Sequence, residues 1–209
     1  RVTFDDVLDV IEAEQTEDIL RLVGTSDEEE IRGTWSETVQ TRLPWLALNL
    51  VTASIAAFVI WIFRDTVESI IILAVLAPII AALGGNAGTQ ALAVTVRRIS
   101  LAGEGEIGQG PYRAVGKELL VGMVNGVVLG AVIALVSLLI PGGNPTLGVV
   151  VLLAMWGNLI VAGFAGSFVP TILNRFGLDP AVASSVFVHT FTDLIGFLLL
   201  LGLATSMLL

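Results

Sequence analysis

Residues 44–63 read PWLALNLVTASIAAFVIWIF, a run of twenty residues without a charged side chain. As an α-helix this run would be about 30 Å long, which matches the hydrocarbon thickness of a bilayer. Trp45 and Trp61 stand near its two ends, where aromatic side chains commonly anchor a helix at the membrane surface. The run therefore predicts a membrane-spanning helix that ends at the charged pair Arg64 and Asp65.

Four further apolar segments follow along the chain. We expect helices over residues 67–99, 112–140, 146–176 and 181–209, separated by connections rich in glycine and proline. Only 14% of the residues are charged and 55% are hydrophobic, whereas a soluble domain carries about 25% charged residues. The sequence therefore predicts an all-α integral membrane protein with five transmembrane helices per chain and the lipid bilayer as its solvent.

The second of these segments contains the sequence GGNAGTQ at residues 84–90. Together with Pro78, its glycines predict a kinked or broken helix at membrane depth, which is tolerated only where protein or a water-filled cavity surrounds the backbone. Asn86, Thr89 and Gln90 add neutral oxygen atoms, and hard cations such as magnesium and calcium prefer oxygen ligands. Helix packing is the alternative use of such a glycine-rich run. A phosphate-binding loop is excluded because no strand precedes the glycines and no lysine follows them.

The first 42 residues differ from the rest of the chain in charge. They hold 12 of the 19 acidic residues and 4 of the 10 basic residues, a net charge of −8. We expect residues 1–42 to be an acidic cytoplasmic tail and residues 43–209 to be the five-helix membrane domain. Because the chain begins with Arg1, we expect it to be part of a longer protein. The acidic segment would attract cations and repel nucleic acid, so no nucleic-acid partner is expected, although most charge runs are simply solvated surface.

Two short helices are expected within this acidic segment. Val7, Leu8 and Ile11 form an apolar stripe at helical spacing, and Thr3 stands three residues before Asp6, as a helix cap requires. A second helix of one or two turns is expected over residues 17–22.

The basic residues predict the orientation of the chain. With the N-terminus in the cytoplasm and five spans, nine of the ten Lys and Arg residues lie inside and only Arg64 lies outside. Such an excess of positive charge marks the cytoplasmic side of membrane proteins. The C-terminus is therefore expected to face outward.

Asp193 is the only acidic residue in the fifth apolar segment. It stands about 12 residues into that helix, roughly 18 Å from its cytoplasmic start. A charge at that depth costs at least about 2.5–3.5 kcal/mol on insertion scales, and no Lys or Arg is expected beside it. We interpret Asp193 as a side chain that faces water, an ion or a proton path. The alternative is a protonated carboxyl bonded to a neighbouring helix.

Polar side chains surround Asp193 on one face of the same helix. Ser185, His189, Asp193 and Gly196 recur at helical spacing, and Thr192 flanks them. A polar stripe on an otherwise apolar helix predicts an interior cavity or a pore. His189, the only histidine, could contact water, bond a neighbouring helix or ligate a softer metal.

Enzymatic chemistry is poorly supported, and we expect no enzyme. The chain has no cysteine, and an aspartic dyad needs two carboxylates, whereas the membrane core supplies one per chain. Ser185 and His189 are one turn apart on a single helix, which favours a shared face over a nucleophile and its base. A purely structural scaffold would leave Asp193 unexplained.

Two longer stretches carry a family resemblance. GGNAGTQ followed by ALAVTVRR at residues 84–98, and DPAVASSVFVHTFTDLIGF at residues 179–197, resemble the transmembrane domain of the MgtE family of magnesium channels and transporters. VTFDDVLDVIEAEQTEDI at residues 2–19 is similar to the family's junction between paired cystathionine-β-synthase-like regulatory modules and a membrane-plugging helix. The resemblance implies a homodimer with a pore along its two-fold axis, lined by the second and fifth membrane helices. It also implies cytosolic domains that close the pore when intracellular Mg²⁺ is high.

The resemblance also implies roles for individual residues. Asp193 matches the pore aspartate that holds a hydrated Mg²⁺ ion, and the two copies would face each other across the axis. The expected pore-lining residues are Gly85, Asn86, Thr89, Gln90, Ser185, His189, Thr192 and Gly196. The expected regulatory acidic cluster, where Mg²⁺ would screen repulsion, is Asp5, Asp6, Asp9, Glu12, Glu14, Glu17 and Asp18.

Some positions depart from the family pattern. Ser185 and His189 stand where other members often have Asn or Ser and a small residue, and Val186 replaces a frequent proline. These departures bear on ion selectivity and not on the fold. The expected function is a channel that moves hydrated Mg²⁺ down its electrochemical gradient, and the alternative is a divalent cation transporter coupled to Na⁺ or H⁺.

Overall fold

The computed structural model describes residues 3–22, 34–101, 111–140, 144–180 and 184–209. Seven helices lie in these ranges, and no strand occurs among them. The helices are α1 (Phe4–Leu22), α2 (Trp35–Ile62), α3 (Arg64–Ser69), α4 (Ile72–Leu101), α5 (Pro111–Leu139), α6 (Pro145–Arg175) and α7 (Ser184–Leu208).

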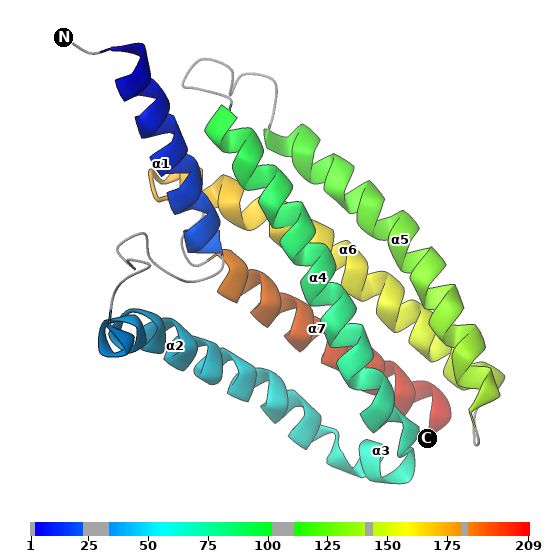
Figure 1. The fold of residues 1–209 in the computed structure, drawn as a ribbon. Helices are drawn as coiled ribbons and strands as arrows, with labels where there is room; N and C mark the ends of the chain where they lie inside the picture. The colour runs from blue at the N-terminus through cyan, green and yellow to red at the C-terminus, as the bar shows by residue number, and fades with distance from the viewer. Residues whose placement is uncertain (1–2, 23–33, 102–110, 141–143, 181–183) are drawn as a thin grey trace.

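Five of the described helices are long and apolar enough to cross a membrane, namely α2, α4, α5, α6 and α7. The expected all-helical fold with five candidate spans is therefore confirmed. Helix α6 lies at the centre of the bundle and packs against α4, α5 and α7, whereas α2 lies at one side against α7 (Figure 1). The main apolar core joins α6 to its neighbours α4 and α7, with Leu73, Met155 and Leu200 fully buried in it.

Helix α6 has clear start and stop signals. The side chain of Asn144 accepts a hydrogen bond of 2.7 Å from the backbone N–H of Leu147, and Pro145 occupies the first turn, where a missing N–H removes no helical bond. Beyond the helix, Gly177 adopts φ = 72°, a conformation that favours glycine. The central helix of the bundle is therefore delimited by its own sequence.

Small residues bring α5 and α6 close together. A Cβ on Gly122 would meet the carbonyl oxygen of Leu159, a Cβ on Gly126 would lie 2.9 Å from the Cα of Trp156, and one on Gly130 would lie 3.0 Å from the carbonyl oxygen of Leu152. These glycines recur every four residues and form one ridge along α5. The ridge packs directly against backbone, as small-residue contacts between membrane helices do.

The acidic lead-in forms one continuous helix, α1, and not two short pieces. The backbone N–H of Thr3 donates to Asp6 Oδ2 at 2.7 Å, and the N–H of Asp6 donates to Thr3 Oγ1 at 3.3 Å. This reciprocal cap agrees with the expected role of Thr3. The bonds from the Thr3 backbone and side chain lower the pKa of the Asp6 carboxyl, because they favour its charged form.

Helix α2 begins at Trp35, well before Pro44, where the apolar run begins. The backbone N–H of Thr34 donates to Glu37 Oε2 at 2.8 Å, which secures this polar start. The expected domain boundary between residues 42 and 43 falls inside this continuous helix. The division into a cytoplasmic tail and a membrane domain stays a prediction.

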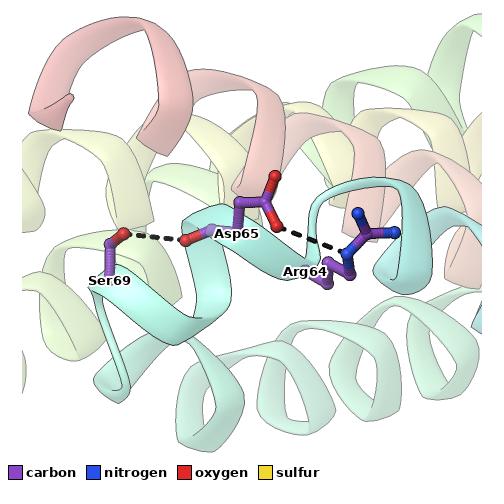
Figure 2. A network of polar contacts seen from close by, with 3 residues as sticks. All are labelled: Arg64, Asp65 and Ser69. Atoms are coloured by element: carbon purple, nitrogen blue, oxygen red, sulfur yellow. Dashed lines mark hydrogen bonds and ion pairs between the residues drawn. The ribbon is translucent and has the colours of Figure 1, made fainter.

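A short corner joins α2 to α4 through α3. Arg64 Nε lies 3.3 Å from Asp65 Oδ1, and Ser69 Oγ donates to the carbonyl oxygen of Asp65 at 2.8 Å (Figure 2). The Arg64 guanidinium also lies 5.2 Å from the ring centre of Trp61. Because both charged side chains are largely exposed, the ion pair contributes little to stability.

Helix α4 runs without interruption from Ile72 to Leu101. Of the kinked or broken helix expected here, the break at residues 84–90 is therefore wrong, whereas a kink stays a prediction. The glycines of this segment bring neighbouring helices close instead of ending the helix. A Cβ on Gly84 would meet the side-chain nitrogen of Asn158, and one on Gly88 would meet a methyl group of Val188.

Candidate functional site

The structure brings the two sequence motifs together, GGNAGTQ on α4 and the polar stripe on α7. A Cβ on Gly85 would lie 3.0 Å from His189 Cδ2 and 3.2 Å from its Nε2, and one on Gly84 would lie 3.2 Å from the Cβ of Thr192. Glycine at these positions is what allows α4 to lie against α7. The two segments that are expected to line one pore therefore lie side by side in the structure.

Asp193 lies within the candidate span of α7. The described helix begins at Ser184, so Asp193 is about 9 residues, or roughly 14 Å, from its start. The expected helix start at residue 181 falls outside the described residues. The Asp193 side chain is partly buried, and the described part of the chain offers its carboxylate no hydrogen-bond donor from a neighbouring helix.

His189 stands one turn before Asp193 on the same helix and is exposed in the single chain. Its Nδ1 lies 2.9 Å from the carbonyl oxygen of Ser185. Because a carbonyl can only accept, Nδ1 carries the proton in this bond. In the neutral ring, Nε2 then holds a free lone pair on the side of α4, next to Gly85.

Thr192 and Gly196 turn inward, away from the exposed side of α7. Thr192 is fully buried, and its Oγ1 donates to the carbonyl oxygen of His189 at 3.0 Å. Gly196 faces α6, where a Cβ would lie 2.8 Å from Asn158 Nδ2. Within the single chain these two residues contact neighbouring helices, and their place on a pore wall stays a prediction.

The three oxygen-bearing side chains of the α4 motif are exposed in the single chain, those of Asn86, Thr89 and Gln90. Thr89 Oγ1 donates to the carbonyl oxygen of Gly85 at 2.9 Å. Gln90 borders a cavity of about 220 Å³ between α4, α5 and α6, whose other polar side chains are Lys117, Glu118 and Asn125.

Asn158 on α6 is a site residue that sequence reasoning missed. It is fully buried, and its Nδ2 donates to the carbonyl oxygen of Ile80 on α4 at 3.0 Å. Its Oδ1 has no hydrogen-bond partner in the described structure. The available signal was a lone amide side chain in the middle of the otherwise apolar stretch VVVLLAMWGNLIVAG at residues 149–163.

Protein ligands for a bare metal ion are scarce. Among the residues that the structure describes, no group of three or more His, Cys, Asp or Glu side chains is placed to hold a metal. The polar groups on the shared side of α4 and α7 are one carboxylate, one imidazole and neutral oxygen atoms. This set is better suited to an ion that keeps its own waters than to an ion whose ligands all come from the protein.

Helix α1 carries the acidic cluster expected from the sequence. Asp6 and Asp9 are exposed and Glu17 is partly buried, whereas the side chains of Asp5, Glu12, Glu14 and Asp18 lie outside the described part. At the end of α1, Leu22 packs against a small core cluster formed by Leu92, Val96, Ala165 and Val188. The acidic helix thus ends beside the C-terminal half of α4 and the first turns of α7.

Comparison with known proteins identifies the family. The sequence profile of the MgtE family, described as a divalent cation transporter, matches residues 77–203, which run from α4 to α7 and include both motifs. The chain belongs to the MgtE family. Together with the five apolar helices, membership of the MgtE family makes this a multi-pass protein of the cell membrane.

Three MgtE relatives match almost the whole chain. The magnesium transporter MgtE of Enterococcus faecalis is 38% identical over 204 residues, 98% of this chain and 44% of that protein. The magnesium transporters MgtE of Bacillus subtilis and Thermus thermophilus are each 32% identical, over 98% and 99% of this chain and 45% and 46% of theirs. The chain therefore spans less than half the length of these MgtE relatives.

Proposed function

We propose that this chain is the membrane part of a magnesium channel. In this proposal, hydrated Mg²⁺ moves down its electrochemical gradient through a pore on the two-fold axis of a homodimer. The wall of the pore is formed by α4 and α7. The relatives that match the chain are named as magnesium transporters, which supports Mg²⁺ as the ion.

The observation that carries the proposal is the position of Asp193. Its carboxylate lies within the candidate span of α7, one turn after His189, whose ring lies against Gly85 of α4, and the described residues offer the carboxylate no hydrogen-bond donor. A mid-membrane charge is costly unless water, an ion or a partner offsets that cost. A water-filled path that carries cations supplies such a partner.

The chemistry of Mg²⁺ fits this site. Mg²⁺ releases its waters reluctantly and is commonly bound through one or two carboxylates with several waters retained. Two Asp193 carboxylates, one from each chain, would supply two negative charges around a hydrated divalent ion. A membrane potential of 100 mV then contributes about 4.6 kcal/mol to the inward movement of each ion.

The charge distribution supports a cytoplasmic N-terminus and an outward C-terminus. Arg97 and Arg98 at the end of α4, Arg113 and Lys117 at the start of α5, and Arg175 at the end of α6 lie at one end of the bundle (Figure 1). Arg64 lies at the opposite end. This bias is typical of the cytoplasmic side of membrane proteins.

Regulation by intracellular Mg²⁺ is the second part of the proposal. The acidic helix α1 ends beside α4 and α7, so in this proposal screening of its charges by Mg²⁺ acts on the end of the pore. Cytosolic domains would complete this sensor in the longer protein. We therefore expect flux through this fragment to be insensitive to millimolar Mg²⁺ on the cytoplasmic side. Equal inhibition of the fragment and the full-length protein in proteoliposomes would contradict this role.

The decisive experiment measures Mg²⁺ flux into proteoliposomes for the wild-type protein and for Asp193→Asn. The asparagine keeps the shape of the side chain but removes both charges of the dimer, so we expect flux to fall at least about tenfold, equivalent to about 1.4 kcal/mol. Folding and assembly should be unchanged, because the substitution removes a costly charge. Wild-type flux in Asp193→Asn would show that charge at this site does not concentrate the ion.

The same assay tests the alternative of a coupled transporter. A channel conducts Mg²⁺ without a gradient of another ion and gives single-channel currents in planar bilayers. If Mg²⁺ flux requires an opposing Na⁺ or H⁺ gradient, the channel proposal is wrong and the coupled mechanism replaces it.

A further inference from the structure

Asn158 is a polar side chain in a place that apolar packing would fill. It lies in the middle of α6, has no exposed surface, and leaves its Oδ1 without a partner in the described structure. A buried acceptor without a donor lowers stability, and an apolar side chain of similar size avoids that loss. Core packing alone therefore does not account for an asparagine here.

The contacts of Asn158 connect α6 to both α4 and α7. Its Nδ2 donates at 3.0 Å to the carbonyl oxygen of Ile80, four residues before Gly84 on α4. Its side-chain atoms are also the nearest neighbours of Gly84 and Gly196. Gly84 begins the α4 motif, and Gly196 lies three residues after Asp193.

At both glycines, the space that a side chain would need is occupied by the amide of Asn158. A Cβ on Gly84 would meet Asn158 Nδ2, and a Cβ on Gly196 would lie 2.8 Å from Nδ2, 3.1 Å from Cγ and 3.3 Å from Oδ1. All three nearest atoms at Gly196 thus belong to Asn158. The amide therefore lies between the glycine segment of α4 and the turn of α7 that carries Asp193, and it contacts both.

We propose that Asn158 is a positioning residue for ion selection, which holds the Asp193 turn of α7 in register with the Gly84–Gln90 segment of α4. The inference rests on the proposed function, because it assigns to Asn158 the spacing between two walls of the pore. Asn158 does not touch the ion. It acts through the placement of the carboxylate and of the α4 oxygens, and its loss changes which cations pass.

The first test substitutes Asn158 itself. In proteoliposomes, Asn158→Ala and Asn158→Leu should change the ratio of Mg²⁺ to Ca²⁺ flux at least about threefold, within the range of energetic coupling between residues in contact. The control is Ser167→Ala on the same helix. Ser167 is also fully buried, but its hydroxyl donates only within α6, to the carbonyl oxygens of Gly163 at 2.7 Å and Phe164 at 3.2 Å. Ser167→Ala should keep the wild-type ratio.

The second test moves the amide without changing it. Gly196→Ala adds a methyl group whose three nearest neighbouring atoms all belong to Asn158. This variant should therefore also change the Mg²⁺ to Ca²⁺ ratio. Gly202→Ala on the same helix is its control, because a Cβ there meets nothing within 4 Å. In the double variant Asn158→Ala with Gly196→Ala, the ratio should equal that of Asn158→Ala. Additive changes would mean that Gly196 acts directly on the ion.

The outcomes separate this inference from the proposed function. If the wild-type protein conducts no Mg²⁺, the proposed function and the inference both fall. If the wild-type protein conducts, Asp193→Asn does not, and Gly196→Ala and every folded Asn158 variant keep the wild-type ratio, only the role of Asn158 is overturned. Because Gly196→Ala leaves position 158 intact, an unchanged ratio in this variant overturns the role of Asn158 even where the Asn158 variants fail to fold.

Discussion

At the scale of single residues, the site contains two ionisable side chains one turn apart with different chemistry. Asp193 offers oxygen, which hard cations prefer, and His189 offers a nitrogen, which suits transition metals. The bond from His189 Nδ1 to the carbonyl oxygen of Ser185 leaves Nε2 as the free ring nitrogen. Asp193 is therefore suited to concentrate divalent cations and His189 to discriminate among them.

This division of labour predicts the effect of His189→Ala. Mg²⁺ flux should stay within about threefold of wild type, while flux of Co²⁺ and Mn²⁺ relative to Mg²⁺ should fall, because an imidazole nitrogen favours those ions. Proteoliposome flux with each cation measures the ratios. Thr190→Ala is the control, since that hydroxyl donates within its own helix to the carbonyl oxygen of Val186 at 2.7 Å. An equal loss for all cations would show that the ring supports the structure and not the choice of ion.

At the scale of elements, the sequence predicts the five candidate spans well because lipid imposes long apolar runs. The sequence does not distinguish a broken α4 from the continuous helix of the structure, because glycine has two uses in membrane helices. A glycine-rich run can release the backbone, or it can admit a close neighbour, and only the packing partner distinguishes the two. In α4 the partners are Asn158, Val188 and the ring of His189. For the same reason, the sequence does not single out Asn158, because its contacts are with helices far away in the sequence.

The close approach of α4 and α6 predicts a pair of unequal glycine substitutions. A Cβ on Gly166 would meet the carbonyl oxygen of Gly88 and lie 2.8 Å from the Cβ of Ala91. Because backbone cannot move aside cheaply, Gly166→Ala should destabilise the protein by about 1–3 kcal/mol. Gly202→Ala on α7 has open space and should be close to neutral.

Thermal unfolding in detergent measures both glycine variants. Gly166→Ala should lower Tm clearly, and Gly202→Ala should leave it near the wild-type value. Equal Tm values for the two variants would contradict the close packing of α6 against α4.

At the scale of the whole molecule, the proposed pore is shared by two chains, each of which would supply half of its charge. Asp193 supplies a single carboxylate, and the described residues contain no cluster of acids or histidines that could hold an ion without help. A two-fold axis beside α4 and α7 would pair the carboxylate with its copy, because a symmetric dimer repeats each residue across the axis. The sequence could indicate the lone carboxylate, whereas the pairing depends on assembly and stays a proposal.

A tandem dimer, two copies of the chain fused by a linker, tests whether the two chains share one pore. With Asp193→Asn in one copy only, a shared pore loses one of its two charges. Flux should then show a weaker apparent affinity for Mg²⁺, between those of the wild-type tandem and the doubly substituted tandem. Two independent pores would instead give half of the wild-type maximal flux with an unchanged affinity, because the intact copy would work as before. Placing the substitution in the first or the second copy must give the same result, since a two-fold axis makes both positions equivalent. The concentration dependence of Mg²⁺ flux in proteoliposomes therefore decides between a shared pore and separate pores, and an unchanged affinity would contradict the dimeric pore.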